Sequence, residues 1–281
     1  MSYSVGGFCF TAEGMPFEPD NLAPFRTESP DNPIFSLKVV SNLPETPLQL
    51  LYRTDEDPGF PEITIYTQEG GYLVETRPLP HLPTACRMTV DKEFRKAHLM
   101  LCSESDTFAL NNSMMLLYAF STANLGAVMM HASTVMNGSK GYLFLGKSGT
   151  GKSTHSRLWM KNIPDTELLN DDNPILRISD DGAIVYGSPW SGKTPCYKAT
   201  SVPAAAIVQL SQAPANRIRR MPPVLAYASL MASSSAFRPF KSLADGWHNT
   251  LERIVTTVPC YHLECLPDAD AAHLCYNTVN G

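Results

Sequence analysis

Residues 146–153 read Gly-Lys-Ser-Gly-Thr-Gly-Lys-Ser, and this stretch decides the fold prediction. It matches the P-loop pattern, in which a glycine and any four residues precede Gly-Lys-Ser or Gly-Lys-Thr. Residues 140–145 (KGYLFL) precede it as a predicted strand, and residues 154–162 (THSRLWMKN) follow it as a predicted helix. Because a P-loop joins a strand to a helix, this context predicts a domain with an α/β (or α+β) fold that binds a nucleoside triphosphate.

Each part of the loop has an expected task. The glycines let the backbone approach the phosphates closely, and the start of the helix adds a partial positive charge. Lys152 is expected to reach the β- and γ-phosphates, and the hydroxyl of Ser153 is expected to hold Mg²⁺. The predicted nucleotide-binding residues are Gly146, Lys147, Ser148, Gly149, Thr150, Gly151, Lys152, Ser153 and Thr154.

A P-loop site also needs an acidic residue at the end of a nearby strand. The short apolar run that starts at residue 167 stops at Asp171 and Asp172, which offer two adjacent carboxylates. One can hold the metal ion, and the other can accept the proton of an attacking hydroxyl. The alternative is a solvated acidic turn, which is the interpretation preferred for Asp180 and Asp181.

A hairpin is predicted immediately before the loop. Residues 127–136 are expected to form one strand, and Asn137-Gly138 is a typical hairpin turn that leads into residues 140–145. Because this hairpin sets antiparallel neighbours beside the loop strand, the predicted sheet is mixed. His131 lies on the first strand, fifteen residues before Gly146. Its residue type leaves both a structural and a functional role open.

The chain before the hairpin has a different pattern. Residues 62–103 contain short alternating segments with Gly70-Gly71 as a turn, which predicts an antiparallel, β-rich module. A helix is expected over residues 111–123. We therefore predict a β-rich N-terminal module over residues 1–105, which could help to choose the acceptor, and a P-loop core over residues 106–281.

Composition excludes several classes of protein. The 281 residues carry a net charge of −5, whereas a general nucleic-acid binder needs a basic surface. The apolar run over residues 114–120 is too short to span a membrane. Seven cysteines at irregular spacing, with no Cys-x-x-Cys, are typical of reduced thiols. With no signal sequence recognised, we expect a cytoplasmic protein that binds neither nucleic acid nor membrane.

The order of these motifs resembles the HPr kinase/phosphorylase family. His131-Ala-Ser is followed by the hairpin, by GKSGTGKS and by a strand that ends in Asn170-Asp171-Asp172. The loop is also similar to that of phosphoenolpyruvate carboxykinases, which share the same mixed-sheet P-loop kinase core. Carboxykinases are much longer, and the spacing fits the HPr kinase type better. The resemblance covers residues 128–210 and does not extend to residues 1–105.

The resemblance implies roles for single residues. His131 corresponds to a histidine that supports proton transfer near the acid pair. Asp171 corresponds to the base that activates the acceptor serine hydroxyl, and Asp172 to the acid that assists the metal. Lys152 would neutralise the transferred phosphate. The implied cofactors are ATP and Mg²⁺, and the implied assembly is a homo-oligomer.

One stretch departs from the family. Where HPr kinases carry a Glu and an Arg-Gly-x-Gly segment, residues 187–193 read Gly-Ser-Pro-Trp-Ser-Gly-Lys. Lys193 could contact the phosphate or the acceptor, and Trp190 could form a wall of the site. Core packing for Trp190 and solvation for Lys193 are the alternatives. The cluster Arg217, Arg219 and Arg220 is interpreted as a solvated surface.

Two functions from different classes remain open on the sequence. The first is a Mg²⁺-ATP-dependent kinase that phosphorylates a hydroxyl, most simply a serine, of a protein, peptide or small molecule. The second is a nucleotide-binding regulatory module with little or no phosphotransfer.

Overall fold

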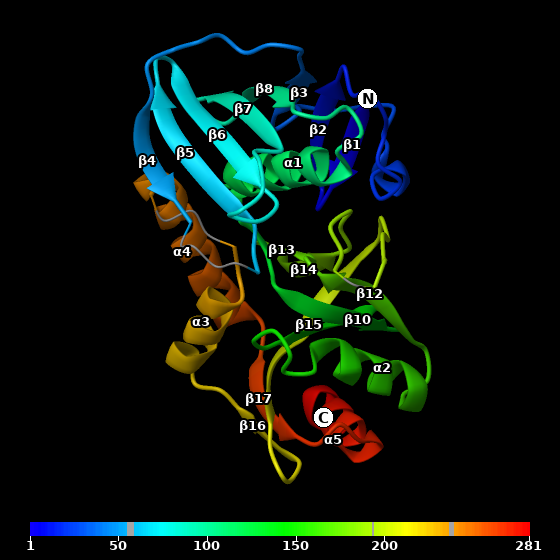
Figure 1. Ribbon diagram of the computed structural model, residues 1–281. Helices are drawn as coiled ribbons and strands as arrows, with labels where there is room; N and C mark the ends of the chain where they lie inside the picture. The colour runs from blue at the N-terminus through cyan, green and yellow to red at the C-terminus, as the bar shows by residue number, and fades with distance from the viewer. Residues whose placement is uncertain (55–58, 193, 236–238) are drawn as a thin grey trace. The chain divides into compact units, whose positions relative to one another are not determined.

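The computed structural model describes residues 1–54, 59–192, 194–235 and 239–281. They divide into two compact units (Figure 1). Unit 1 consists of Met1–Thr122 and a short segment that ends at Lys241, and unit 2 contains the remaining described residues from Ala123 onward.

Unit 1 is built on one mixed sheet with the strand order β1-β2-β3-β8-β7-β6-β5-β4. Helix α1 packs against β7 and β8. Its elements are β1 (Ser2–Val5), β2 (Phe8–Glu13), the 3-10 helix η1 (Ala23–Phe25), β3 (Ser36–Val39), β4 (Gln49–Arg53), β5 (Glu62–Gln68), β6 (Gly71–Arg77), β7 (Cys86–Asp91), β8 (Lys96–Leu101) and α1 (Thr107–Thr122).

Two features of unit 1 differ from the sequence prediction. The sheet is not wholly antiparallel, because β3 pairs in parallel with both β2 and β8. Long connections on both sides of β3 let it enter the sheet in the same direction as these neighbours. Helix α1, which the expected boundary after residue 105 placed with the P-loop core, belongs to unit 1, since it buries Leu110, Met114 and Leu117 there.

Unit 2 is built on a second mixed sheet with the strand order β12-β10-β11-β15-β14-β13-β9. Strand β17 also pairs with β15, and β16 pairs with β17. The elements are β9 (Ala127–Met129), β10 (Ala132–Asn137), β11 (Lys140–Leu145), α2 (Lys152–Asn162), β12 (Thr166–Asp172), β13 (Ile175–Ser179), β14 (Gly182–Tyr186), β15 (Ser201–Gln212), β16 (Arg217–Arg220), α3 (Pro223–Ala232), α4 (Lys241–Thr257, its first residue grouped with unit 1), β17 (Cys260–Cys265) and α5 (Ala269–Asn280).

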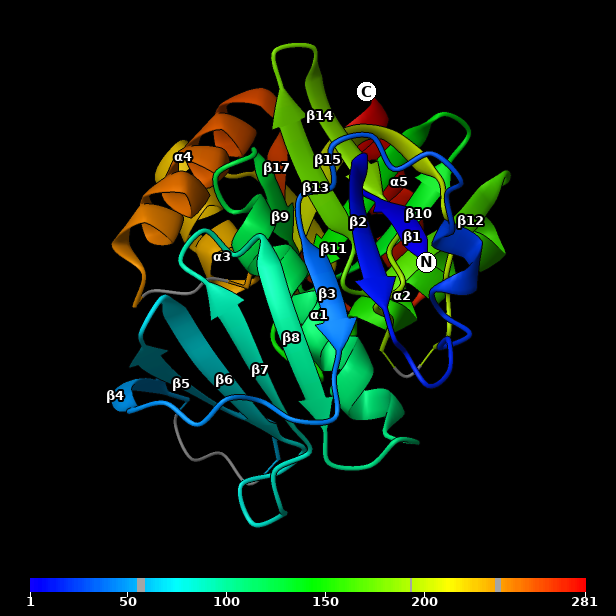
Figure 2. The ribbon, with the colours of Figure 1, turned by 90° about the horizontal axis from the view of Figure 1, so that it is seen from above.

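Strand β11 has apolar side chains on both faces because helices cover both faces of the sheet. Tyr142 and Phe144 pack in a core with residues of α2 and α5. Leu143 and Leu145 point to the other core, which includes residues of α3 and α4. Figure 2 shows α3 and α4 on the opposite side of these strands from α5. This double burial accounts for the unbroken apolar run before the loop.

The predicted strand over residues 127–136 is two strands. Strand β9 pairs with β13, whereas β10 pairs with β11 and β12. Met130 and His131 lie between them, and the backbone N–H of His131 donates to the carbonyl of Ser233. The predicted hairpin is therefore formed by β10 and β11 alone. Its expected consequence, a mixed sheet, is confirmed, because β11 is antiparallel to β10 and parallel to β15.

No described helix combines the length and apolar character that crossing a membrane would require.

Candidate functional site

The stretch 146–153 connects β11 to α2. β11 ends at Leu145 and α2 begins at Lys152, in the strand-loop-helix order that the sequence predicts. Gly149 has a φ of 80° and Gly151, which caps the helix, has a φ of 108°. Side chains rarely tolerate these angles, so glycine lets the loop turn sharply into the helix. The free N–H groups at the start of α2 and its dipole favour an anion at this place.

Sheet register brings the histidine and the acid pair to this loop. Strand β10 lies between β11 and β12, and its first residue, Ala132, pairs with Leu145 on one side and with Asp172 on the other. His131, one residue earlier, therefore lies at the edge of the sheet where the loop begins and β12 ends. The sequence placed these residues far apart along the chain, and the antiparallel pairing of β10 with both neighbours brings them together.

Lys152, His131 and Asp172 form a continuous chain of contacts. Lys152 Nζ lies 3.0 Å from His131 Nε2 and donates to the carbonyl of Gly146 at 2.9 Å. His131 Nδ1 lies 2.8 Å from Asp172 Oδ1. An ammonium group cannot accept a hydrogen bond, so Nε2 accepts and Nδ1 carries the proton toward the carboxylate. Burial lowers the pKa of Lys152, while the charges of Asp172 and Asp171 oppose this shift.

The other acid of the pair contacts the other polar residue of the loop. Ser153 donates a hydrogen bond from Oγ to Asp171 Oδ1 at 2.9 Å. Asp171 is only 6% exposed, whereas the side chain of Asp172 is 35% exposed. A serine hydroxyl next to a carboxylate is an oxygen donor set that suits Mg²⁺, which takes few protein ligands and completes its shell with phosphate and water. Among the described residues, no cluster of three or more His, Cys, Asp or Glu side chains forms a metal site.

The backbone of Asp172 is strained. Its φ is 117°, a value at which a residue other than glycine costs about 1–3 kcal/mol. The following segment holds it in place: Asp172 bridges to Ser191, and Gly192 donates its N–H to the carbonyl of Asp171 at 2.7 Å. Asn173 donates from Nδ2 to Asp172 Oδ2 at 3.1 Å. The carboxylate thus has both oxygens positioned by neighbouring side chains.

Asn170 holds the end of β12, which carries the acid pair, through hydrogen bonds of its side-chain amide. The sequence did not predict this role. Its fully buried side chain donates to the carbonyls of Ser188, Trp190 and Cys196, at 3.3 to 3.4 Å. Its Oδ1 accepts from the backbone N–H of Asn173 at 2.9 Å. A single amide therefore ties the end of β12 to the segment that follows β14. The Asn-Asp-Asp sequence after an apolar strand is the signal that could have shown it.

The other predicted site residues are dispersed. Thr154 lies in the first turn of α2, and Lys147 and Ser148 are exposed on the loop. Trp190 is buried at 5% exposure, and its carbonyl accepts from Asn170. Lys193 lies outside the described residues. Arg217, Arg219 and Arg220 are exposed on the edge strand β16, where Arg219 approaches Glu264 at 3.7 Å.

No protein-family model matches the chain, and no curated protein matches it. Among solved structures, the Hpr(Ser) kinase/phosphatase from Coxiella burnetii is similar over 54% of this chain and 88% of its own, at 13% identity and a TM-score of 0.32. This likeness is distant.

Proposed function

We propose that the protein is a Mg²⁺-ATP-dependent kinase that transfers the γ-phosphate to a hydroxyl group. The observation that carries this proposal is the convergence of two contacts at one end of the loop: Lys152 meets Asp172 through His131, and Ser153 meets Asp171. A triphosphate-binding loop alone would account for binding. Two acids held in different surroundings beside it support phosphoryl transfer, because they can divide metal binding and proton transfer.

The contacts favour an exchange of the roles that the family resemblance implied for the two acids. Asp171 is buried and already bonded to Ser153, so we assign it to the metal ion. Asp172 is more exposed and is oriented by His131 and Asn173, so we assign it as the base that an acceptor can reach. When bound there, Mg²⁺ would neutralise charge on the phosphates.

Catalysis in this proposal is mainly positioning and charge stabilisation. The acceptor hydroxyl oxygen bonds to the γ-phosphorus, and the bond from that phosphorus to the β,γ-bridging oxygen breaks. The hydroxyl proton passes to Asp172, and a nucleoside diphosphate leaves. Lys152 balances the negative charge on the transferred group, and His131 keeps Asp172 in the orientation that accepts the proton.

The test combines binding and transfer. The chain is incubated with Mg²⁺, γ-labelled ATP and cell extract, and labelled molecules are identified by mass spectrometry. We expect one acceptor to gain phosphate on a hydroxyl, and Lys152→Ala to abolish both ATP binding and labelling. Lys161→Ala, an exposed lysine in the last turn of the same helix, serves as the matched control. Tight ATP binding without any labelled acceptor would favour the regulatory module instead.

A further inference from the structure

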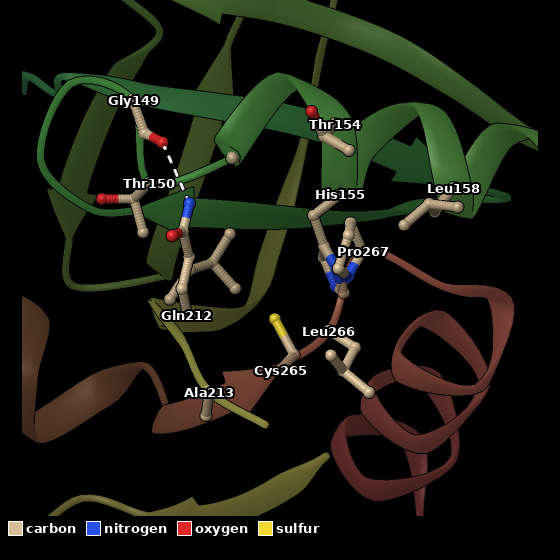
Figure 3. A pocket seen from close by; sticks show the side chains of 12 residues that line it. Gly149, Thr150, Thr154, His155, Leu158, Gln212, Ala213, Cys265, Leu266 and Pro267 are labelled. Atoms are coloured by element: carbon tan, nitrogen blue, oxygen red, sulfur yellow. Dashed lines mark hydrogen bonds between the residues drawn. The ribbon is translucent and has the colours of Figure 1, made fainter. Parts of the chain in front are cut away.

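A pocket opens on another side of the loop from the acid pair. Its volume is about 580 Å³, and its wall combines residues 149–151 of the loop with side chains of α2, the end of β15 and the segment after β17 (Figure 3). Its lining residues do not include Asp171, Asp172, His131 or Lys152. This volume lies within the range of small-molecule sites, which are mostly apolar with a few fixed polar groups.

The residues that line this pocket are mostly apolar, with a few polar groups among them. Leu158, Leu210, Leu266 and Pro267 supply apolar surface. Gln212 donates from Nε2 to the carbonyl of Gly149 at 3.3 Å, which ties the end of β15 to the loop (Figure 3). The pocket is therefore joined physically to the loop proposed to bind phosphate.

His155 supplies one fixed hydrogen-bond donor in this wall. It is only 3% exposed, and its ring extends from α2 toward Leu266 and Pro267 (Figure 3). Trp159 donates from its indole Nε1 to His155 Nε2 at 3.1 Å. An indole N–H can only donate, so Nε2 must accept and the proton of the neutral ring resides on Nδ1. Within the described residues, Nδ1 has no hydrogen-bond partner, and burial lowers the pKa of His155 to about 4, which keeps the ring neutral.

The direction of a bound phosphate chain follows from the loop. Lys152 Nζ lies on the side of Gly146 and His131, so the terminal phosphate belongs there. The rest of the molecule must leave in another direction, past the N–H groups at the start of α2. Thr154 and His155 follow Lys152 and Ser153 in this first turn, and both line the pocket.

We propose that this pocket receives the base and ribose of the nucleotide, with His155 Nδ1 donating a hydrogen bond to a ring nitrogen or carbonyl of the base. This inference rests on the proposed function and deepens it: it assigns the residues that would select a donor with a base over an inorganic polyphosphate. A donor without a base would leave both the apolar wall and the His155 N–H unused.

Cys265 provides a reporter for occupancy. Its side chain lines the pocket from the end of β17 and is partly exposed (Figure 3). A base seated between α2 and this segment would shield the thiol from an alkylating reagent. Tripolyphosphate, which has no base, would occupy the loop and leave Cys265 as reactive as before.

The experiment compares MgATP with Mg-tripolyphosphate by calorimetry. We expect wild-type protein to bind ATP at least about ten-fold more tightly, the equivalent of roughly 1.4 kcal/mol. Ala213→Phe, which fills the pocket at its rim, should remove this advantage while tripolyphosphate binding stays unchanged. His155→Phe should weaken ATP binding about ten-fold, as expected for one lost hydrogen bond. Ala232→Phe, an exposed alanine at the end of α3, is the matched control.

The alkylation of Cys265 by N-ethylmaleimide, followed by peptide mass mapping, gives a second measurement. ATP should slow it several-fold and tripolyphosphate should not. Equal affinity for the two ligands, or equal protection by both, would overturn the base pocket while leaving the loop function intact. Failure of both ligands to bind would instead overturn the proposed function and this inference together.

Discussion

His131 Nδ1 lies 2.8 Å from Oδ1 of Asp172, and this contact fixes how the more exposed acid of the pair faces the site. The same ring accepts from Lys152 at 3.0 Å. One imidazole therefore orients both a proton acceptor and a phosphate-binding cation.

Replacing His131 with Gln tests this link. We expect kcat to fall about 10²-fold, because misplacing a catalytic group by around one ångström can cost that much. KM for ATP should change far less, since the loop keeps its N–H groups. Steady-state kinetics on the identified acceptor measure both. A rise in KM with kcat unchanged would show that His131 only helps to bind the nucleotide.

The two acids should behave differently when each is changed to Asn. Asp172→Asn should lower kcat about 10²- to 10⁴-fold and leave ATP affinity intact, as loss of a general base predicts. Asp171→Asn should instead weaken Mg²⁺-dependent ATP binding, because it removes the carboxylate bonded to Ser153. Calorimetry with and without Mg²⁺ separates these effects. If Asp171→Asn spares binding and abolishes transfer, Asp171 is the base, as the family resemblance implies, and Asp172 is not.

Gly192 permits the close packing that holds Asp172. A Cβ added at Gly192 would lie 2.9 Å from Asp172 Cβ and 3.2 Å from its Cγ. Gly192→Ala should therefore displace the carboxylate and reduce phosphotransfer roughly 10-fold or more, with little loss of ATP binding. Gly281→Ala at the C-terminus, where the nearest atom would be 3.1 Å away, is the matched control. Wild-type transfer by Gly192→Ala would mean that the segment can yield without moving Asp172.

Asn170→Leu should destabilise the fold. The substitution removes the donor to the carbonyls of Ser188 and Cys196 and the acceptor of the Asn173 N–H, and a buried group left unsatisfied costs about 1–3 kcal/mol. We expect the free energy of unfolding to fall by about 3 kcal/mol in a urea titration. Asn162→Leu on α2, whose side chain donates to the neighbouring carbonyl of Leu158, should cost much less because Asn162 is only partly buried. An equal fall in the free energy of unfolding for the two variants would contradict the proposal that Asn170 holds the end of β12 in place.

His155 predicts a pH dependence of stability. Burial lowers its pKa from 6.5 to about 4, so the unfolded chain gains a proton at higher pH than the folded one. The stabilisation is fully present above pH 6.5 and declines as the pH falls toward 4, by about 3 kcal/mol at most. His155→Gln, which stays neutral throughout, should show a shallower decline in the free energy of unfolding. Parallel curves for the two proteins would show that the ring does titrate in the folded state.

The local sequence predicted those elements whose residue pattern is complete within a few neighbouring residues. The apolar run at residues 140–145, the glycines at 149 and 151 and the helix after them specify strand, turn and helix within a few residues of chain. The mixed sheet followed from the hairpin turn at Asn137-Gly138. Strand β16 and helix α5 were not predicted, and β16 was interpreted from its arginines as a solvated cluster.

The sequence by itself therefore determined that residues 146–153 form a turn suited to phosphate, with a lysine and a serine at its helix end. Only the tertiary structure decided which partner each acid has, because that depends on strand register. Asp171 and Asp172 are adjacent in the chain, yet their side chains diverge at the strained backbone of Asp172, one toward Ser153 and one toward His131. The pocket beside His155 likewise forms from segments distant in sequence, which no local pattern specifies.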